Sequence, residues 1–233
     1  MLILSFDTSA QSCGVALTDT EKVISEIQLN RGSKHSEQLL PMIDHVLGNA
    51  KKTIGDIDLI VVSSGPGSFT GVRIAVATAK ALSQGREIPL VAVNSLELLA
   101  SNCLCPKSLI VPMLDARKNE VYTALFRRKE EGLLRVSEDY PSKPSELFTS
   151  LKEEESVIFL GENIEPYRDQ IKAILKERAL LAPVSFGSIR ASEAAFLGLE
   201  KYRAGDLADH FDLAPTYLRK PEAETSWEAK QGG

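Results

Sequence analysis

The stretch Gly65–Gly71 (GPGSFTG) has the residue types from which ligand-binding loops are built. Glycine lets a backbone adopt positive φ and approach a ligand, and free amides at the start of a following helix attract anions. The glycines read G-x-G-x-x-x-G with no Lys-Ser/Thr pair, which is no known phosphate fingerprint, and Pro66 excludes a nucleophile elbow around Ser68. The loop is predicted either to bind an anion or backbone, through Gly65, Gly67 and Ser68, or to be a tight turn between a strand and a helix.

Asp7 ends the apolar run at the start of the chain and is followed by two hydroxyl side chains, Thr8 and Ser9. Such a set could hold magnesium or a phosphate, although an Asp at the end of a strand also commonly begins a turn. Residues 110–125 are similar to residues 2–17 in the order of their apolar and acidic residues. The offset is 108 (115 − 7), so Asp115 corresponds to Asp7. The echo favours an ancestral phosphate-side role for Asp7.

The three histidines, His35, His45 and His210, form no metal-binding pattern. A helical histidine site needs ligands three or four residues apart, and no two of them are so spaced. No histidine can be paired from the sequence with a carboxylate and a nucleophile, so neither a metal site nor a catalytic residue is predicted. Cys103 and Cys105 form C-x-C rather than C-x-x-C, which favours two surface thiols over a metal or redox site.

The composition is typical of a globular protein from a reducing compartment. Of the 233 residues, 43% are apolar and 25% charged, which disfavours disorder and collagen. Three cysteines argue against a disulfide framework. Because 27 basic and 32 acidic residues give a net charge of −5, the chain offers no net attraction for nucleic-acid phosphates. With no signal-like or membrane-length apolar run, we expect a cytoplasmic protein without a membrane partner.

Hydrophobic periodicity predicts an α/β protein of two duplicated halves, each a β-β-β-α-β unit. In the first half we expect strands at 2–6, 13–17, 23–28, 57–62 and 89–93 and helices at 36–47, 72–82 and 95–100. In the second we expect strands at 110–114, 121–125, 133–136 and 157–160 and helices at 145–151, 165–177 and 188–204. The predicted domains are an N-terminal lobe at 1–105, a C-terminal lobe at 106–219 and a polar, disordered tail at 220–233. Two such halves resemble actin, the sugar kinases and the heat-shock ATPases, which alone says nothing about activity.

Five motifs stand in order along about the first 220 residues. They are Phe6–Ser9 (FDTS), Lys34–Glu37 (KHSE) with Leu40-Pro41, Gly65–Arg73 (GPGSFTGVR), Asp115–Arg117 with Glu120–Tyr122, and Tyr217–Arg219 after Pro215. Together they resemble the bacterial TsaB family, also called YeaZ. The GPGSFTGVR run is highly specific, and five motifs in the right order make coincidence unlikely.

The resemblance implies the actin-like ATPase (ASKHA) fold and a role in making threonylcarbamoyladenosine at adenosine 37 of tRNA. In that pathway a catalytic paralogue, TsaD, transfers the threonylcarbamoyl group from an adenylate to N6 of the base. The TsaB family member is the dimerisation partner of TsaD, and the P-loop ATPase TsaE docks on the pair. The resemblance therefore implies that this chain meets tRNA only through the complex.

The resemblance also implies what this chain lacks. TsaD carries a metal-binding His-x-x-x-His just after the strand that corresponds to residues 89–93, and here Ser95 and Leu99 stand at those positions. The second half lacks a glycine-rich adenine-binding turn, because Gly161 and Gly187 stand alone. We therefore expect a non-catalytic subunit without a tightly bound cofactor. ATP or ADP would bind weakly or only in the complex, at Asp7, Thr8, Ser9, Gly65, Gly67 and Ser68.

The resemblance places the partner surface on the helices at about residues 35–47 and 71–82. On packing grounds we expect this surface to be formed by His35, Leu39, Leu40, Ile43, Val72, Ala75, Val76 and Ala79. The same face should form homodimers when the partner is absent, and Asp in place of Ala75 should abolish pairing with the fold intact. The alternatives are a stand-alone weak ATPase using Asp7, a metal-independent glycoprotease-like peptidase, and an independent tRNA binder, against which the net charge argues.

Overall fold

The first lobe is built on a five-stranded sheet. Its elements are β1 (Ile3–Asp7), β2 (Cys13–Thr18), β3 (Val23–Leu29), α1 (His35–Asn49), β4 (Leu59–Ser63), α2 (Phe69–Arg86) and β5 (Leu90–Val93). The computed structural model describes residues 1–30, 34–130 and 132–219, so the predicted disordered tail lies outside the described residues. The strand order is β3-β2-β1-β4-β5. Because β1, β4 and β5 are parallel, the chain crosses over through α1 and α2 between them.

The second lobe repeats this topology. Its elements are β6 (Leu109–Asp115), β7 (Val121–Thr123), β8 (Phe126–Lys129), β9 (Gly132–Arg135), β10 (Tyr140–Ser142), α4 (Pro144–Ser150), β11 (Val157–Leu160), α5 (Arg168–Leu175) and β12 (Ala179–Leu181). The main path of the sheet runs β10-β7-β6-β11-β12, which matches the first sheet strand for strand. The predicted duplication of β-β-β-α-β halves is therefore confirmed.

The third strand of the second lobe differs from the prediction. The run at 133–136 does form a strand, β9, but β9 pairs only with β8, and this hairpin is attached to β6. The place of the third strand is taken by β10, which pairs with β7. Because β10 is three residues long and contains Pro141, which is confined to sheet edges, its sequence signal is weak.

The two halves do not share the register that the sequence echo predicts. Phe6 on β1 packs with α1 and α2, whereas Val111 and Met113 on β6 pack with α4 and α5. Successive strand side chains point to opposite faces, so an even offset of 108 would put Phe6 and Leu114 on corresponding faces. Leu114 instead lies on the opposite face, in the core between the lobes. Asp7 and Asp115 are therefore not structural equivalents, and this part of the prediction is wrong.

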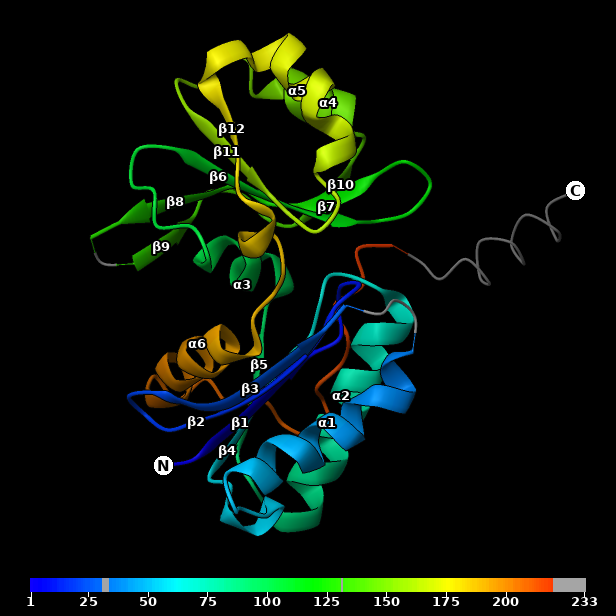
Figure 1. The fold of residues 1–233 in the computed structure, drawn as a ribbon, viewed down its shortest axis with the longest axis vertical. Coiled ribbons are helices and arrows are strands. Elements are labelled where there is room, and N and C mark those ends of the chain that lie inside the picture. The colour runs from blue at the N-terminus through cyan, green and yellow to red at the C-terminus, as the bar shows by residue number, and fades with distance from the viewer. Residues whose placement is uncertain (31–33, 131, 220–233) are drawn as a thin grey trace, which may run out of the picture.

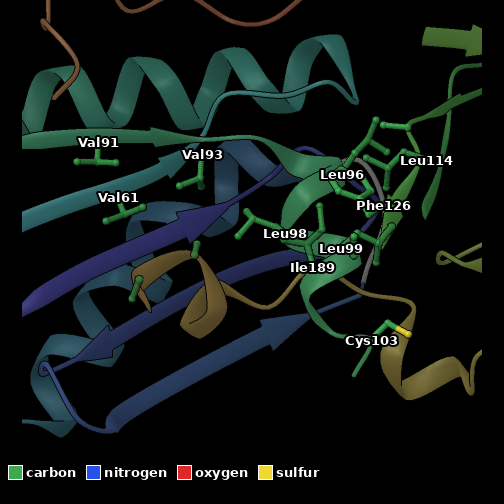
Figure 2. Close-up of a cluster of buried hydrophobic side chains, with 14 of the residues drawn as sticks. Val61, Val91, Val93, Leu96, Leu98, Leu99, Cys103, Leu114, Phe126 and Ile189 are labelled. Carbon is green, nitrogen blue, oxygen red and sulfur yellow. The ribbon is translucent and has the colours of Figure 1, made fainter. Parts of the chain in front are cut away.

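Helices cover both faces of the first sheet (Figure 1). α1 and α2 pack on its outer face, and α4 and α5 on the outer face of the second sheet. Between the sheets lie α3 (Ser95–Ser101) and α6 (Ala191–Arg203). Their side chains form one core with the inner faces of both sheets, from Val61 and Val93 through Leu98 to Phe126 (Figure 2). This continuous apolar core joins the lobes.

α6 returns to the first lobe although it follows the second in sequence. It packs on β1, β2 and β5, and the Ser5 hydroxyl donates to the Ala191 carbonyl at 2.7 Å. The segment after α6 stays there, since the Ala208 amide donates to the Leu90 carbonyl at 2.8 Å. The C-terminal lobe predicted at 106–219 therefore includes chain that packs with the first sheet. Across residues 1–30, 34–130 and 132–219, no helix has the length and hydropathy needed to cross a membrane.

Candidate functional site

A cleft of about 370 Å³ lies between the lobes, where β1 and β6 end. From the first lobe it is lined by Ser9, Ala10, Gln11, His35 and Ser68. From the second lobe it is lined by Met113, Leu114, Asp115, Arg117, Glu162 and Asn163. Of the residues predicted from sequence to bind a nucleotide or a partner, Ser9, Ser68 and His35 line this cleft.

Asp7 lies behind the cleft and does not line it. Its carboxyl group is fully buried, and Oδ1 accepts hydrogen bonds from the Ser9 hydroxyl at 2.6 Å and the Ser9 amide at 3.2 Å. Oδ2 has no hydrogen-bond partner among the described residues. Burial raises the pKa of Asp7 to about 6, although the hydrogen bonds from Ser9 act in the opposite direction. In this conformation Asp7 holds the turn through Ser9 and is not among the residues that line this cleft.

The glycine-rich loop packs on the β1–β2 turn by backbone contact. A Cβ atom on Gly67 would stand 2.1 Å from the Ser9 carbonyl oxygen, and one on Gly71 would stand 1.9 Å from that of Thr8. The Ser68 amide donates to the Ser9 carbonyl at 2.6 Å, and the Thr8 hydroxyl donates to the Gly71 carbonyl at 2.6 Å. The loop is therefore a tight turn between β4 and α2 that also binds the backbone of the β1–β2 turn, and anion binding stays a prediction.

The same loop determines where α2 begins. The Ser68 hydroxyl accepts a hydrogen bond from the Gly71 amide at 3.3 Å, so the helix starts at Phe69 rather than at the predicted Val72. Gly65 has a φ of +104°, in the left-handed region that favours glycine. The loop is thus an N-cap and a packing element for the first lobe.

His35 belongs to the wall of the cleft. Its side chain is 6% exposed, and Nε2–H donates to the Ala10 carbonyl at 3.1 Å, which leaves Nδ1 buried without a partner among the described residues. Burial lowers the pKa of His35, and the nearby Glu162 carboxylate opposes that shift. The predicted place of His35 in a partner surface does not fit, because the start of α1 turns toward the cleft.

Glu162 is a site residue that sequence reasoning missed. It follows β11 in the second lobe, and its carboxylate reaches the β1–β2 turn of the first. Oε2 accepts from the Gln11 amide at 2.8 Å, while Oε1 accepts from the Ser12 amide at 3.3 Å and from the Ser12 hydroxyl. No periodicity or motif marks a single acid after an isolated glycine, so the sequence carried no signal for this contact.

The β6–β7 turn forms the opposite wall and is strained. Arg117, Lys118 and Asn119 have φ values of 61°, 51° and 58°, three consecutive residues in the left-handed region. Asp115 is exposed, and its Oδ1 accepts a hydrogen bond from the Arg117 amide at 2.8 Å. Strain of this kind persists only where surrounding contacts enforce it.

The segment after α6 brings three of the sequence motifs together. Tyr217 stacks on Phe69 with ring centroids 4.7 Å apart, and Arg73 donates to the Tyr217 hydroxyl at 2.6 Å. The Arg73 guanidinium also lies 3.7 Å from the Phe69 ring centroid. Arg219 forms an ion pair with Glu120 at the end of the β6–β7 turn. The C-terminal segment therefore links α2 to the second lobe, a contact that sequence reasoning did not predict.

Most of the predicted partner residues on α1 and α2 lie inside the lobe. The apolar stripes of both helices face inward, so six of the predicted residues are buried: Leu39, Ile43, Val72, Ala75, Val76 and Ala79. Of the eight predicted residues, only Leu40 is exposed, at 54%. Ala75 is fully buried, so Asp in its place would enter the core, and we now expect this change to destabilise the fold. Residues that are exposed on these helices include Leu40 on α1 and Ala77 and Ala81 on α2.

The polar groups around the cleft are largely engaged with one another. The Ser9 hydroxyl donates to Asp7, the Ser68 hydroxyl caps α2, and Glu162 holds the amides of the β1–β2 turn. In the part of the chain that the structure describes, no three His, Cys, Asp or Glu side chains are grouped to hold a metal ion. Of these contacts, those of Glu162 connect the second lobe to the first, and the other two hold the loops of the first lobe.

Comparisons with known proteins found relatives in both sequence and structure. The family model "TsaD: tRNA N6-adenosine threonylcarbamoyltransferase" matches residues 22–227. The tRNA threonylcarbamoyladenosine biosynthesis protein TsaB of Bacillus subtilis (strain 168) is 38% identical to this chain, over 97% of this chain and 98% of its own length. YeaZ from Pseudomonas aeruginosa is similar in structure, with a TM-score of 0.80 and 23% identity over 93% of this chain and 99% of that one.

A nucleotide-bound protein shares the fold. The activator of 2-hydroxyisocaproyl-CoA dehydratase from Clostridium difficile, with bound ADPNP, matches with a TM-score of 0.52 and 9% identity, over 88% of this chain and 97% of that one. These likenesses and the duplicated sheets confirm the predicted actin-like ATPase fold.

Proposed function

Because the chain belongs to the TsaB family of tRNA threonylcarbamoyladenosine biosynthesis proteins, we propose that it is the non-catalytic scaffold of a transferase complex. In this proposal it pairs with the catalytic paralogue TsaD, which transfers the threonylcarbamoyl group to N6 of adenosine 37, and the ATPase TsaE docks on the pair. The complex works in the cytoplasm, and tRNA is bound by the assembly.

One observation carries the non-catalytic role. Ser95 and Leu99 stand where the resemblance places the metal-binding histidines of the paralogue, and both side chains are fully buried. The Ser95 hydroxyl shares a hydrogen bond of 2.6 Å with Ser63, and Leu99 packs in the core between the lobes. A metal ion would need polar ligands open to substrate at these positions, whereas Ser95 bonds to β4 within the first lobe and Leu99 packs between the lobes.

The proposed partner surface is the exposed side of α1 and α2, centred on Leu40, Ala77 and Ala81. Small side chains on α2 let a second helix approach closely, and Leu40 supplies an apolar contact. A helix pair from TsaD would pack there to form a bundle. A second copy of this chain would use the same face when TsaD is absent.

We propose no tightly bound cofactor. ATP or ADP binds weakly or only within the complex, since Asp7 is sealed behind the cleft and Gly65 and Gly67 pack on backbone. The same two facts weigh against a stand-alone ATPase.

The surface is tested by placing one charge on two equivalent exposed helix positions. Ala77→Asp lies on α2, and Ala173→Asp lies on α5 of the other lobe as the matched control. Each chain is mixed with TsaD of the same organism, and the mass of the complex is measured by size-exclusion chromatography with light scattering. A desolvated carboxylate should weaken pairing by at least about tenfold for Ala77→Asp and leave Ala173→Asp unchanged.

Two outcomes would contradict the proposal in different ways. If the unaltered chain forms no complex with TsaD, the scaffold role is wrong. If Ala77→Asp pairs as well as the unaltered chain, the role stands and the surface lies elsewhere.

A further inference from the structure

We propose that the C-terminal strap, residues 213–219, is a latch that holds the β6–β7 turn in its strained form and so fixes one wall of the cleft. When the latch is released, the turn relaxes and that wall becomes mobile. This inference does not depend on the scaffold role, because it concerns contacts within one chain. It gives a single physical role to three of the five sequence motifs, which meet only at this strap.

The strap is fixed to the first lobe before it reaches the second. The Thr216 amide donates to the carbonyl of Ser64, directly after β4, at 2.7 Å. Tyr217 stacks on Phe69 with ring centroids 4.7 Å apart, and its hydroxyl accepts a hydrogen bond from Arg73 at 2.6 Å. One backbone bond and one side-chain cluster therefore set the position of the strap against the glycine-rich loop and the first turns of α2.

The end of the strap holds the base of the β6–β7 turn. Arg219 forms an ion pair with Oε2 of Glu120, and that oxygen is buried. Glu120 also closes the turn, because its amide donates to the Arg117 carbonyl at 3.0 Å and its carbonyl accepts from the Ala116 amide at 3.0 Å. Removing one partner of a buried charge pair leaves the other without compensation. Arg219 therefore stabilises Glu120 in the position that closes the turn.

The β6–β7 turn is a segment that needs a contact from outside. Arg117, Lys118 and Asn119 have φ values of 61°, 51° and 58°, a conformation that costs free energy at every residue with a Cβ atom. The strand that follows is only three residues long, so its pairing with β6 anchors the turn weakly. Asp115 and Arg117 line the cleft, so a relaxed turn would move that wall.

Trypsin can measure the release of the latch, because it cuts after arginine and lysine and the turn contains Arg117 and Lys118. When a folded chain opens and closes quickly, the rate of cutting follows the population of the open form. Arg219→Gln removes the charge of the latch and leaves the sequence of the turn unchanged. Arg127→Gln is the matched control, because it removes one arginine and one ion pair of the same lobe, that with Glu154 at 2.7 Å.

The full chain is digested under native conditions, and the fragments are identified by mass spectrometry. Arg219→Gln should be cut after residues 117 and 118 at least about threefold faster than the unaltered chain, and Arg127→Gln should be cut there at the unaltered rate. Tyr217→Ala should also accelerate these cuts, since it loosens the strap at α2 without changing the turn or the ion pair. Cutting after Lys172, within α5, reports unfolding of the whole chain and should stay the same in every variant.

Four results would overturn the inference. Equal rates at the turn in the unaltered chain and Arg219→Gln would mean that the turn's own hydrogen bonds hold it. An equal gain in Arg127→Gln would reduce the effect to the loss of any ion pair in this lobe. An equal gain at Lys172 would mean that unfolding of the whole chain exposes the turn. An unaltered rate in Tyr217→Ala would show that the strap does not hold Arg219 in place.

Discussion

The turns after β1 and β6 occupy matching places in two lobes of one topology, yet they are built in opposite ways. The first turn has a buried Asp7, and it is held by the glycine-rich loop on one side and by Glu162 on the other. The second turn has an exposed Asp115 and a run of left-handed residues from Arg117 to Asn119. The two lobes share one strand order, but the contacts that each turn makes determine whether its aspartate is buried or exposed.

The closest contact at the first turn gives the largest predicted effect. Gly71→Ala should destabilise the chain by about 3 kcal/mol or more, because its Cβ atom would overlap the Thr8 carbonyl oxygen at 1.9 Å and backbone cannot move aside cheaply. Gly85→Ala in the same helix is the control, since no atom lies within 4 Å of its Cβ position. It should stabilise by up to about 1 kcal/mol. Urea denaturation measures both, and equal effects would contradict the packing role of the loop.

The second-largest predicted effect on stability concerns the buried carboxyl group of Asp7. Asp7 has a pKa of about 6 in the folded chain against an ordinary 3.8, so the folded chain holds this proton more tightly. Its contribution to stability is complete below pH 4 and is lost as the pH rises through 6. Asp7→Asn keeps the Oδ1 acceptor without a charge. It should raise the free energy of unfolding by about 2 kcal/mol at pH 7.5 and have little effect below pH 4.

Asp115→Asn is the matched change on the exposed turn. Its effect on the free energy of unfolding should stay within about 0.5 kcal/mol at both pH values, because a surface carboxylate is hydrated in both states. Urea denaturation at pH 3.5 and at pH 7.5 measures the free energy of unfolding of both variants, Asp7→Asn and Asp115→Asn. A pH-independent effect of Asp7→Asn would show that burial of the charge is not what distinguishes the first turn.

The smallest effect concerns the strain of the second turn. Arg117→Gly should stabilise the chain by about 0.5 to 1 kcal/mol, because glycine adopts a φ of 61° without the clash that a Cβ atom suffers. Thermal unfolding measures it, with Arg127→Gly on β8 as a control that should destabilise. If Arg117→Gly also destabilises, contacts of the arginine side chain outweigh the strain.

Local patterns predicted most of the fold. The apolar runs and helical stripes located β1, β4, β11, α1 and α6 to within a few residues, since each signal is contained in the segment itself. The errors concern short strands. β10 was missed because its formation depends on pairing with β7, which is distant in the sequence, and β12 was missed because three residues are too few to show a period. The five motifs identified the family because they are specific in kind and order.

The site was less predictable, for a physical reason. A glycine that approaches a ligand and a glycine that approaches a carbonyl, as Gly71 does, look alike in sequence. An apolar stripe such as Leu39 to Ile43 shows which residues are buried but not whether a sheet or a partner buries them. Glu162 had no signal, because its partners lie about 150 residues away.

The central claim is that this chain supports a transferase without performing the transfer. The direct test is threonylcarbamoyl transfer to tRNA with the adenylate donor and TsaE, comparing this chain alone, TsaD alone and the two together. The account predicts product only when both are present. Product from this chain alone would contradict it.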